Sequence, residues 1–87
     1  MMSPEQIKQM IELGLPGSRA RVEGDDGTHF QAVIICAAFA GKSTLQQHQL
    51  VYQALGNAMG TDIHALSMQT WTPEDWEASG QSQQPDT

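Results

Sequence analysis

The side chains in this sequence best suited to metal or redox chemistry are three histidines and one cysteine: His29, His48, His64 and Cys36. Imidazole is the commonest metal ligand among side chains, and it changes charge near neutral pH. His64 is the most informative of the four. It stands at the head of the alternating run from Ile63 to Met68, where a strand emerges from a loop and a side chain can face solvent. A metal ligand and an ordinary exposed polar residue are the two interpretations of His64.

The other three residues have different surroundings. His29 stands beside Phe30 at the start of an apolar run, where it is either a ligand or an outward-facing strand residue. His48 falls at helical spacing among apolar residues, which favours a partly buried, hydrogen-bonded histidine. Cys36 shares one strand face with apolar residues, which favours a small buried hydrophobe over a reactive thiol. A single cysteine allows no internal disulfide and is typical of a reducing compartment.

Size and charge restrict the class of function. Eighty-seven residues are enough for one small domain. No apolar run approaches the roughly 18 residues needed to span a bilayer, and no signal peptide is evident, so we expect a cytoplasmic chain without a membrane partner. The 10 acidic and 4 basic residues give a formal net charge of -6, which disfavours simple phosphate binding. No nucleophile stands with a base at a plausible spacing, and we predict that the chain is not an enzyme.

The elements follow from periodicity and capping signals. Helices are predicted from the Ser3-Pro4 start, from the Ser43 cap to Gly60, and from the Thr72-Pro73 start. Strands are predicted over 18–23, 29–37 and 63–71. The apolar stripe of the middle helix is predicted to comprise Leu45, His48, Val51, Tyr52, Leu55 and Met59. We expect one domain over residues 1–78 and a disordered tail over 79–87.

The order helix, strand, strand, helix, strand, short helix (α-β-β-α-β-α) predicts an α+β fold. The tight turn Gly24–Gly27 implies that the first two strands pair antiparallel. The helix between the last two strands allows a right-handed crossover and parallel pairing. We therefore predict a three-stranded mixed sheet, with the doubly apolar strand at its centre and the helices packed on one face.

Three segments resemble the BolA family: Phe39-Ala-Gly-Lys-Ser-Thr-Leu-Gln-Gln-His-Gln-Leu-Val-Tyr52, Ile63-His-Ala-Leu-Ser-Met68 and Thr72-Pro-Glu-Asp-Trp76. They stand in the order and at the spacing of the family pattern, and the resemblance covers roughly residues 5 to 77. The short connection from Gly24 to Phe30 looks like the IbaG branch of the family. The resemblance implies a BolA-like fold similar to type II KH domains.

The resemblance also implies a partner and a cofactor. The partner is a monothiol (CGFS-type) glutaredoxin, and a [2Fe-2S] cluster bridges the two proteins. The glutaredoxin supplies its own cysteine and a glutathione thiolate, while this chain supplies His64 and a second ligand from the loop between the first two strands. His29 is the candidate in that loop, and Asp26, a hard ligand for iron, is the alternative. We expect no stable cluster in the isolated chain, because it lacks four ligands, and a homodimer of the apo form stays open.

A KH-like nucleic-acid-binding transcriptional regulator is the alternative function. Its basis is the helix entry at Gly41-Lys42-Ser43, with Lys42, Arg19 and Arg21 as the binding residues. A phosphate-binding P-loop is excluded at this segment, because Cys36 stands where that motif requires its upstream glycine.

Overall fold

The element order agrees with the prediction. A computed structural model describes residues 2–24, 26–63 and 65–80. The elements are α1 (Pro4–Gly14), β1 (Arg19–Glu23), β2 (His29–Ile35), α2 (Thr44–Leu55), β3 (Ala65–Trp71) and α3 (Pro73–Ala78), with short 3-10 helices η1 (Ala37–Phe39) and η2 (Gly56–Ala58). The predicted tail, 79–87, lies outside the described residues from position 81 onward.

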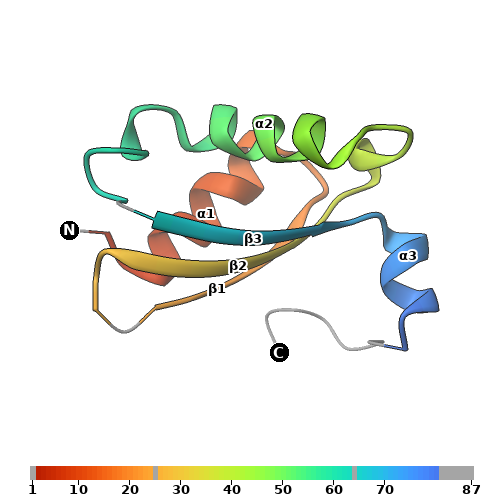
Figure 1. Cartoon of the computed structure of the whole chain (residues 1–87), viewed down its shortest axis with the longest axis horizontal. Helices are drawn as coiled ribbons and strands as arrows, with labels where there is room; N and C mark the ends of the chain where they lie inside the picture. Colours follow the sequence, from red (N-terminus) through yellow and green to blue (C-terminus); the bar gives the residue numbers. More distant parts are fainter. Residues whose placement is uncertain (1, 25, 64, 81–87) are drawn as a thin grey trace.

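The three strands form one sheet in the order β1-β2-β3 (Figure 1). β1 pairs antiparallel with β2, and β2 pairs parallel with β3. α1 and α2 pack against each other and against the sheet, and α3 lies beyond the end of β3. This arrangement confirms the predicted α+β fold with a mixed sheet. Among residues 2–24, 26–63 and 65–80, no helix packs over the second face of the sheet.

The core lies between the two long helices and one face of the sheet. Local signals in the sequence set where the two long helices begin. Ser3 caps α1 and Ser43 caps α2, and in each case the glutamine three places on, Gln6 or Gln46, completes a capping box. In β2 the buried residues alternate, so that one set of side chains faces the helices. The largest fully buried side chains are Phe39, Ile7, Ile11, Ile34, Leu55, Ile63, Val51 and Cys36.

The predicted apolar stripe of α2 is wrong at two of its positions. Val51 and Leu55 are buried as expected, but Leu45 is 68% exposed and Tyr52 is 42% exposed. Within the described part of the chain, the long elements that α2 mainly contacts are α1 and β3, so a narrow face of the helix is sufficient to cover the core. The helix also ends earlier than predicted, at Leu55, because Gly56 turns the chain with a φ of 55°.

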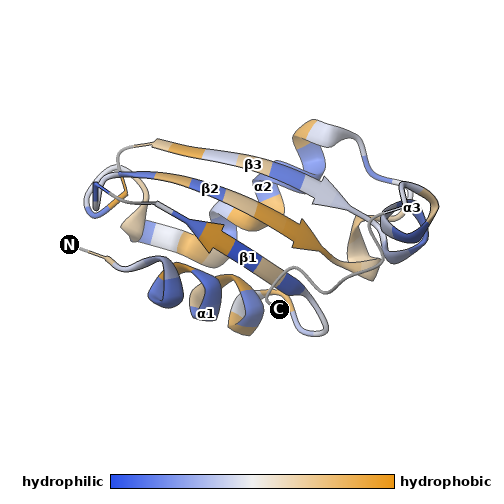
Figure 2. Ribbon diagram, turned by 90° about the horizontal axis from the view of Figure 1, so that it is seen from below, coloured by the Kyte–Doolittle hydropathy of each residue, from blue (hydrophilic) through white to orange (hydrophobic). Residues whose placement is uncertain are grey.

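The exposed positions of β1 and β2 are mainly polar, and those of β3 alternate with its more buried ones. Figure 2 views the sheet with α2 behind it, and its ribbon colours show that hydrophilic and hydrophobic residues alternate along parts of the strands. A shallow groove crosses this open face of the sheet, lined among others by Arg21, Gln31, Ser67 and Gln69. At one end, Trp71 packs edge-on against Trp76 of α3, with ring centroids 5.6 Å apart. This contact holds the short helix against the end of β3.

Candidate metal-binding site

β3, which follows His64 in the chain, begins beside His29. His64 itself lies outside the described residues. The next residue, Ala65, is the first residue of β3 and is paired with His29 in the parallel register. The N–H of Ala65 donates to the carbonyl oxygen of Thr28 over 3.3 Å. The fold therefore places the first residue of the described β3 against the first residue of β2, at the end of the sheet that holds the β1–β2 turn.

The β1–β2 turn is organised by Asp26. Its Oδ1 accepts hydrogen bonds from the backbone N–H groups of Thr28, at 2.9 Å, and of His29, at 2.8 Å. The hydroxyl of Thr28 donates to the same oxygen over 3.3 Å. Asp side chains stabilise turns by binding backbone groups two or three residues ahead, and Gly27, with a φ of 78°, allows the chain to reverse between them. The turn therefore holds the Asp26 carboxylate in a defined orientation.

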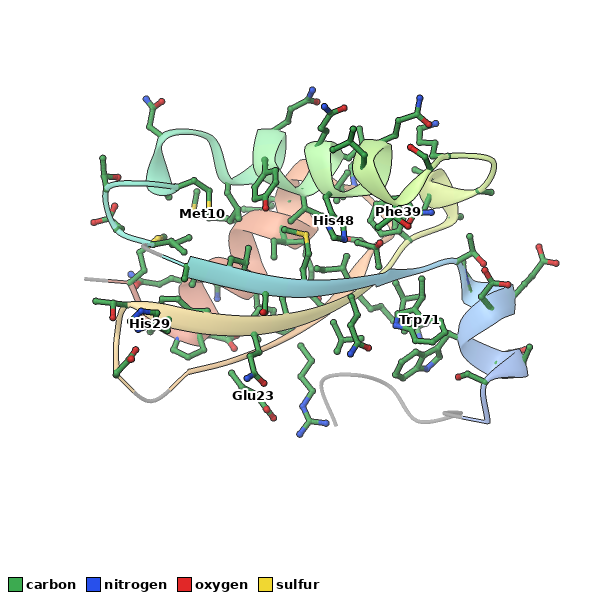
Figure 3. The ribbon with its side chains drawn as sticks, viewed as in Figure 1. Met10, Glu23, His29, Phe39, His48 and Trp71 are labelled. Atoms are coloured by element: carbon green, nitrogen blue, oxygen red, sulfur yellow. The ribbon has the colours of Figure 1, made fainter. Side chains whose placement is uncertain are left out.

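The imidazole of His29 is bound to that carboxylate. Nδ1 of His29 lies 2.7 Å from Oδ2 of Asp26 and 3.0 Å from the hydroxyl oxygen of Thr28. The pair is at the surface: 66% of the His29 side chain and 50% of the Asp26 side chain are exposed. Figure 3 shows His29 at the turn end of the sheet, far from Trp71 at the other end.

Hydrogen bonding keeps Asp26 charged. The backbone N–H of His29 lowers the pKa of the Asp26 carboxyl most, followed by the backbone N–H of Thr28 and the His29 imidazole. Each of these donors stabilises the carboxylate over the carboxylic acid, so the pKa lies well below its usual range. At neutral pH the turn therefore presents a negative charge to Nδ1 of His29.

Gly24 brings the end of β1 close to the same residues. A Cβ at this position would lie 2.6 Å from Cδ1 of Phe30 and 2.7 Å from the carbonyl oxygen of His29. Such distances are too short for a real side chain, so only glycine lets the chain pass here without displacing its neighbours. Because Phe30 is buried in the core, Gly24 couples the turn and His29 to the body of the protein.

Two other candidate ligands lie away from this turn. Cys36 follows β2 at its opposite end and is 2% exposed, which confirms the prediction of a buried hydrophobe. His48 is half-buried on α2, and Figure 3 shows it between that helix and the sheet. Across residues 2–24, 26–63 and 65–80, no group of three or more His, Cys, Asp or Glu residues could hold a metal ion. Of the predicted site residues that are described, the turn brings together His29 and Asp26.

The predicted nucleic-acid-binding residues do not share one face. Arg19 and Arg21 are exposed on β1 and alternate with the buried Ala20, so they project from the open face of the sheet. Lys42 is exposed in the loop that leads into α2, within the helical layer. Arg21 is also paired with Glu23, at 2.8 Å. This separation weakens the cationic surface that the alternative function requires.

Two contributors were not predicted from the sequence. Thr28 contacts both Asp26 and His29, and the Asp-x-Thr spacing of a side-chain-stabilised turn was the available signal. Gln47 of α2 donates to the carbonyl oxygens of Phe39 and Lys42, each at 3.1 Å, and accepts from the hydroxyl of Thr70 at 2.6 Å. Gln47 thus holds the loop before α2 against β3. No local pattern could reveal that contact, because it spans 23 residues.

Comparisons with known proteins point to one family. The sequence model of the BolA-like protein family matches residues 15–75. Human "BolA-like protein 1" is 36% identical over 80 residues, which cover 92% of this chain and 56% of that protein. "DNA-binding transcriptional regulator BolA" of Haemophilus influenzae is 38% identical over 55 residues, 63% of this chain and 53% of that protein. This chain thus spans about half the length of these relatives.

A solved structure agrees with the sequence matches. The "bolA protein homologue from Coxiella burnetii" superposes with a TM-score of 0.81 and is 51% identical, over 88% of this chain and 99% of that one. The described helices are each too short or too polar to cross a lipid bilayer.

Proposed function

Because the chain belongs to the BolA family, we propose that it is a non-catalytic adaptor in iron–sulfur cluster trafficking and iron regulation. It binds a monothiol glutaredoxin and shares a bridging [2Fe-2S] cluster with that protein and its glutathione. His64 and His29 are the ligands from this chain. The observation that carries the proposal is the position of His29: an exposed imidazole, fixed at Nδ1, beside the first residue of β3.

The residues at the turn fit such a cluster. Neutral imidazole is a ligand for iron, and its replacement of thiolate in a [2Fe-2S] centre raises the reduction potential. The contacts of the His29 ring within the described part of the chain involve Nδ1, which leaves Nε2 for a metal. His64 precedes Ala65 in the chain, and Ala65 is paired with His29, so chain connectivity supports a site with ligands from both segments. When bound, the cluster would supply the capacity for electron transfer and for donation to an acceptor protein. The chain would supply the histidine ligands and the surface that surrounds them.

The proposal is tested by adding the protein to a cluster-loaded glutaredoxin homodimer. We expect a 1:1 mixed complex, observed by size-exclusion chromatography, with new visible absorption and circular dichroism. The variants His64→Ala and His29→Ala should each weaken or abolish the new spectrum. His48→Ala is the matched control: it removes an imidazole from α2 and should leave the spectrum unchanged. If the wild-type protein forms no mixed complex and causes no spectral change, the proposal is wrong.

His29 and His64 are tested separately by this series. If His64→Ala alone abolishes the spectrum and His29→Ala does not affect it, His29 is not a ligand and another group completes the site. Folding of each variant is checked by far-ultraviolet circular dichroism. His29→Ala should retain the fold, because the side chain is exposed and lies outside the core.

A nucleic-acid-binding transcriptional regulator is the second candidate. It is favoured by the name of the Haemophilus influenzae relative and by the exposed Lys42 before the capped start of α2. The net charge of -6 opposes it. On this function, Lys42→Glu should sharply reduce binding to DNA, and binding should fall steeply with added salt. No binding at low salt, where the electrostatic attraction is largest, would remove this candidate.

A further inference from the structure

Asp26 makes two separate sets of contacts, one with each carboxylate oxygen. Oδ1 accepts from the backbone N–H groups of Thr28 and His29, and these bonds hold the carboxylate within the turn. Oδ2 is left to face the imidazole of His29, 2.7 Å from Nδ1. The side chain is thereby oriented by the backbone and in turn orients a neighbouring side chain.

A carboxylate at this distance determines which ring nitrogen carries the proton. A charged carboxylate can only accept a hydrogen bond, so the 2.7 Å contact requires a proton on Nδ1. The neutral imidazole then has its lone pair on Nε2. Because the two nitrogens lie on different edges of the ring, the contact at Nδ1 does not engage Nε2, and 66% of the side chain is exposed. His29 also lines a surface depression, together with Glu23, Gly24, Ala65 and Ser67 among others.

We propose that Asp26 is the positioning residue for His29: it fixes the Nδ1–H tautomer and presents Nε2 as the metal-binding atom. This inference rests on the proposed function, since it assigns a role in the same site. It replaces the alternative in which Asp26 is itself a ligand. Both Asp26 oxygens already accept hydrogen bonds, and direct coordination would break the contacts that build the turn. Carboxylates that accept from the second nitrogen of a metal-bound histidine act in this way at other metal sites.

The variant Asp26→Asn separates positioning from turn structure. Its amide oxygen can still accept from the two backbone N–H groups, so the turn is retained. Its amide nitrogen can only donate, and it faces Nδ1, so it favours the opposite tautomer, with the proton on Nε2. Asp26→Ala loses both sets of contacts. Glu74→Gln removes the same single charge from α3, at the other end of the molecule, and is the matched control.

The first measurement uses the apo protein alone. The tautomer of His29 is read from long-range ¹H–¹⁵N correlations at a pH about two units above the ordinary imidazole value near 6.5. We expect Nδ1–H in the wild type and in Glu74→Gln, and predominantly Nε2–H in Asp26→Asn. An Nε2–H tautomer in the wild type would overturn the inference, whatever the protein binds.

The second measurement titrates each variant into the cluster-loaded glutaredoxin. Asp26→Asn should weaken formation of the mixed complex about 10- to 100-fold, as loss of such a partner does at other metal sites. Glu74→Gln should match the wild type. Equal titration curves for Asp26→Asn and the wild type would overturn the positioning role. If the wild type forms no mixed complex, the proposed function fails and the metal role of Nε2 fails with it, while the tautomer measurement still decides whether Asp26 orients the ring.

Discussion

Gly24 offers a direct test of how the turn is connected to the core. In Gly24→Ala the new methyl group would lie 2.6 Å from Cδ1 of Phe30 and 2.7 Å from the carbonyl oxygen of His29. Phe30 is 2% exposed and its ring is held by the core, and the carbonyl belongs to the backbone of β2. Moving either neighbour would disrupt the core or the backbone of β2, so we expect the turn to shift instead.

The expected magnitude follows from two opposing effects. Inserting a methylene-sized group into a packed region destabilises a protein by about 1–3 kcal/mol. Gly→Ala at a backbone conformation that alanine can adopt stabilises by about 0.4–1 kcal/mol, through the unfolded state. This gain applies here, because the φ of Gly24 lies outside the left-handed region. Crowding exceeds the gain, and we expect a net loss of about 1–2 kcal/mol, or a fall in Tm of about 5–15 °C for a domain of this size.

The assay is thermal unfolding followed by circular dichroism, together with the amide and imidazole shifts of His29. Both the Tm and these shifts should change in Gly24→Ala. The same substitution in a Phe30→Leu background should be less destabilising by at least about 0.5 kcal/mol, since the nearest ring carbon is removed. A Tm for Gly24→Ala equal to that of the wild type would refute the crowding at this turn. Equal losses in both backgrounds would show that Phe30 is not the cause.

Three further predictions concern packing, the loop before α2, and pH. Gly14→Ala should destabilise by about 1–3 kcal/mol in urea unfolding, because its Cβ would lie 2.5 Å from Cβ of Ala54; the added substitution Ala54→Gly should recover only part of the loss, because Cα of residue 54 would still lie 2.9 Å away, and no recovery at all would exclude the contact with Cβ as a cause. Gln47→Ala should cost about 1–3 kcal/mol and speed amide hydrogen exchange in the loop before α2, because the carbonyl oxygens of Phe39 and Lys42 each lose a hydrogen bond and the hydroxyl of Thr70 loses its acceptor; unchanged exchange there would contradict this role. Folding lowers the pKa of Asp26, so its stabilising contribution is present above the ordinary value near 4 and is lost as pH falls below it. The stability difference between the wild type and Asp26→Asn should therefore shrink below about pH 4, and a constant difference at lower pH would contradict the cause assigned to this pKa.

Much of the fold was available from local patterns in the sequence. Capping residues with proline at the first helical position mark the starts of α1 and α3, and Ser43 marks the start of α2. The run after His29 is apolar at consecutive positions, and this pattern favours a strand in the middle of a sheet. These signals act within a few residues, so they can be recognised without knowledge of distant neighbours.

Local patterns in the sequence predicted only part of the functional site. The residue types and the motif around His64 identify candidate ligands, and His64 as a ligand stays a prediction, since it lies outside the described residues. The sequence left His29 as either a ligand or an ordinary strand residue. A choice between them requires knowing where Nδ1 points, which depends on the conformation of the turn.

Tertiary structure decided the relations between distant segments. The parallel register places Ala65 beside His29, although 36 positions separate them in the chain, because hydrogen bonding between β2 and β3 sets which residues are neighbours. It also decided which apolar residues of α2 remain at the surface: Leu45 and Tyr52 have helical spacing and the right chemistry, but no element packs over them in the described part of the fold. Periodicity specifies that a helix has an apolar face; only the positions of the neighbouring elements determine how much of that face is buried.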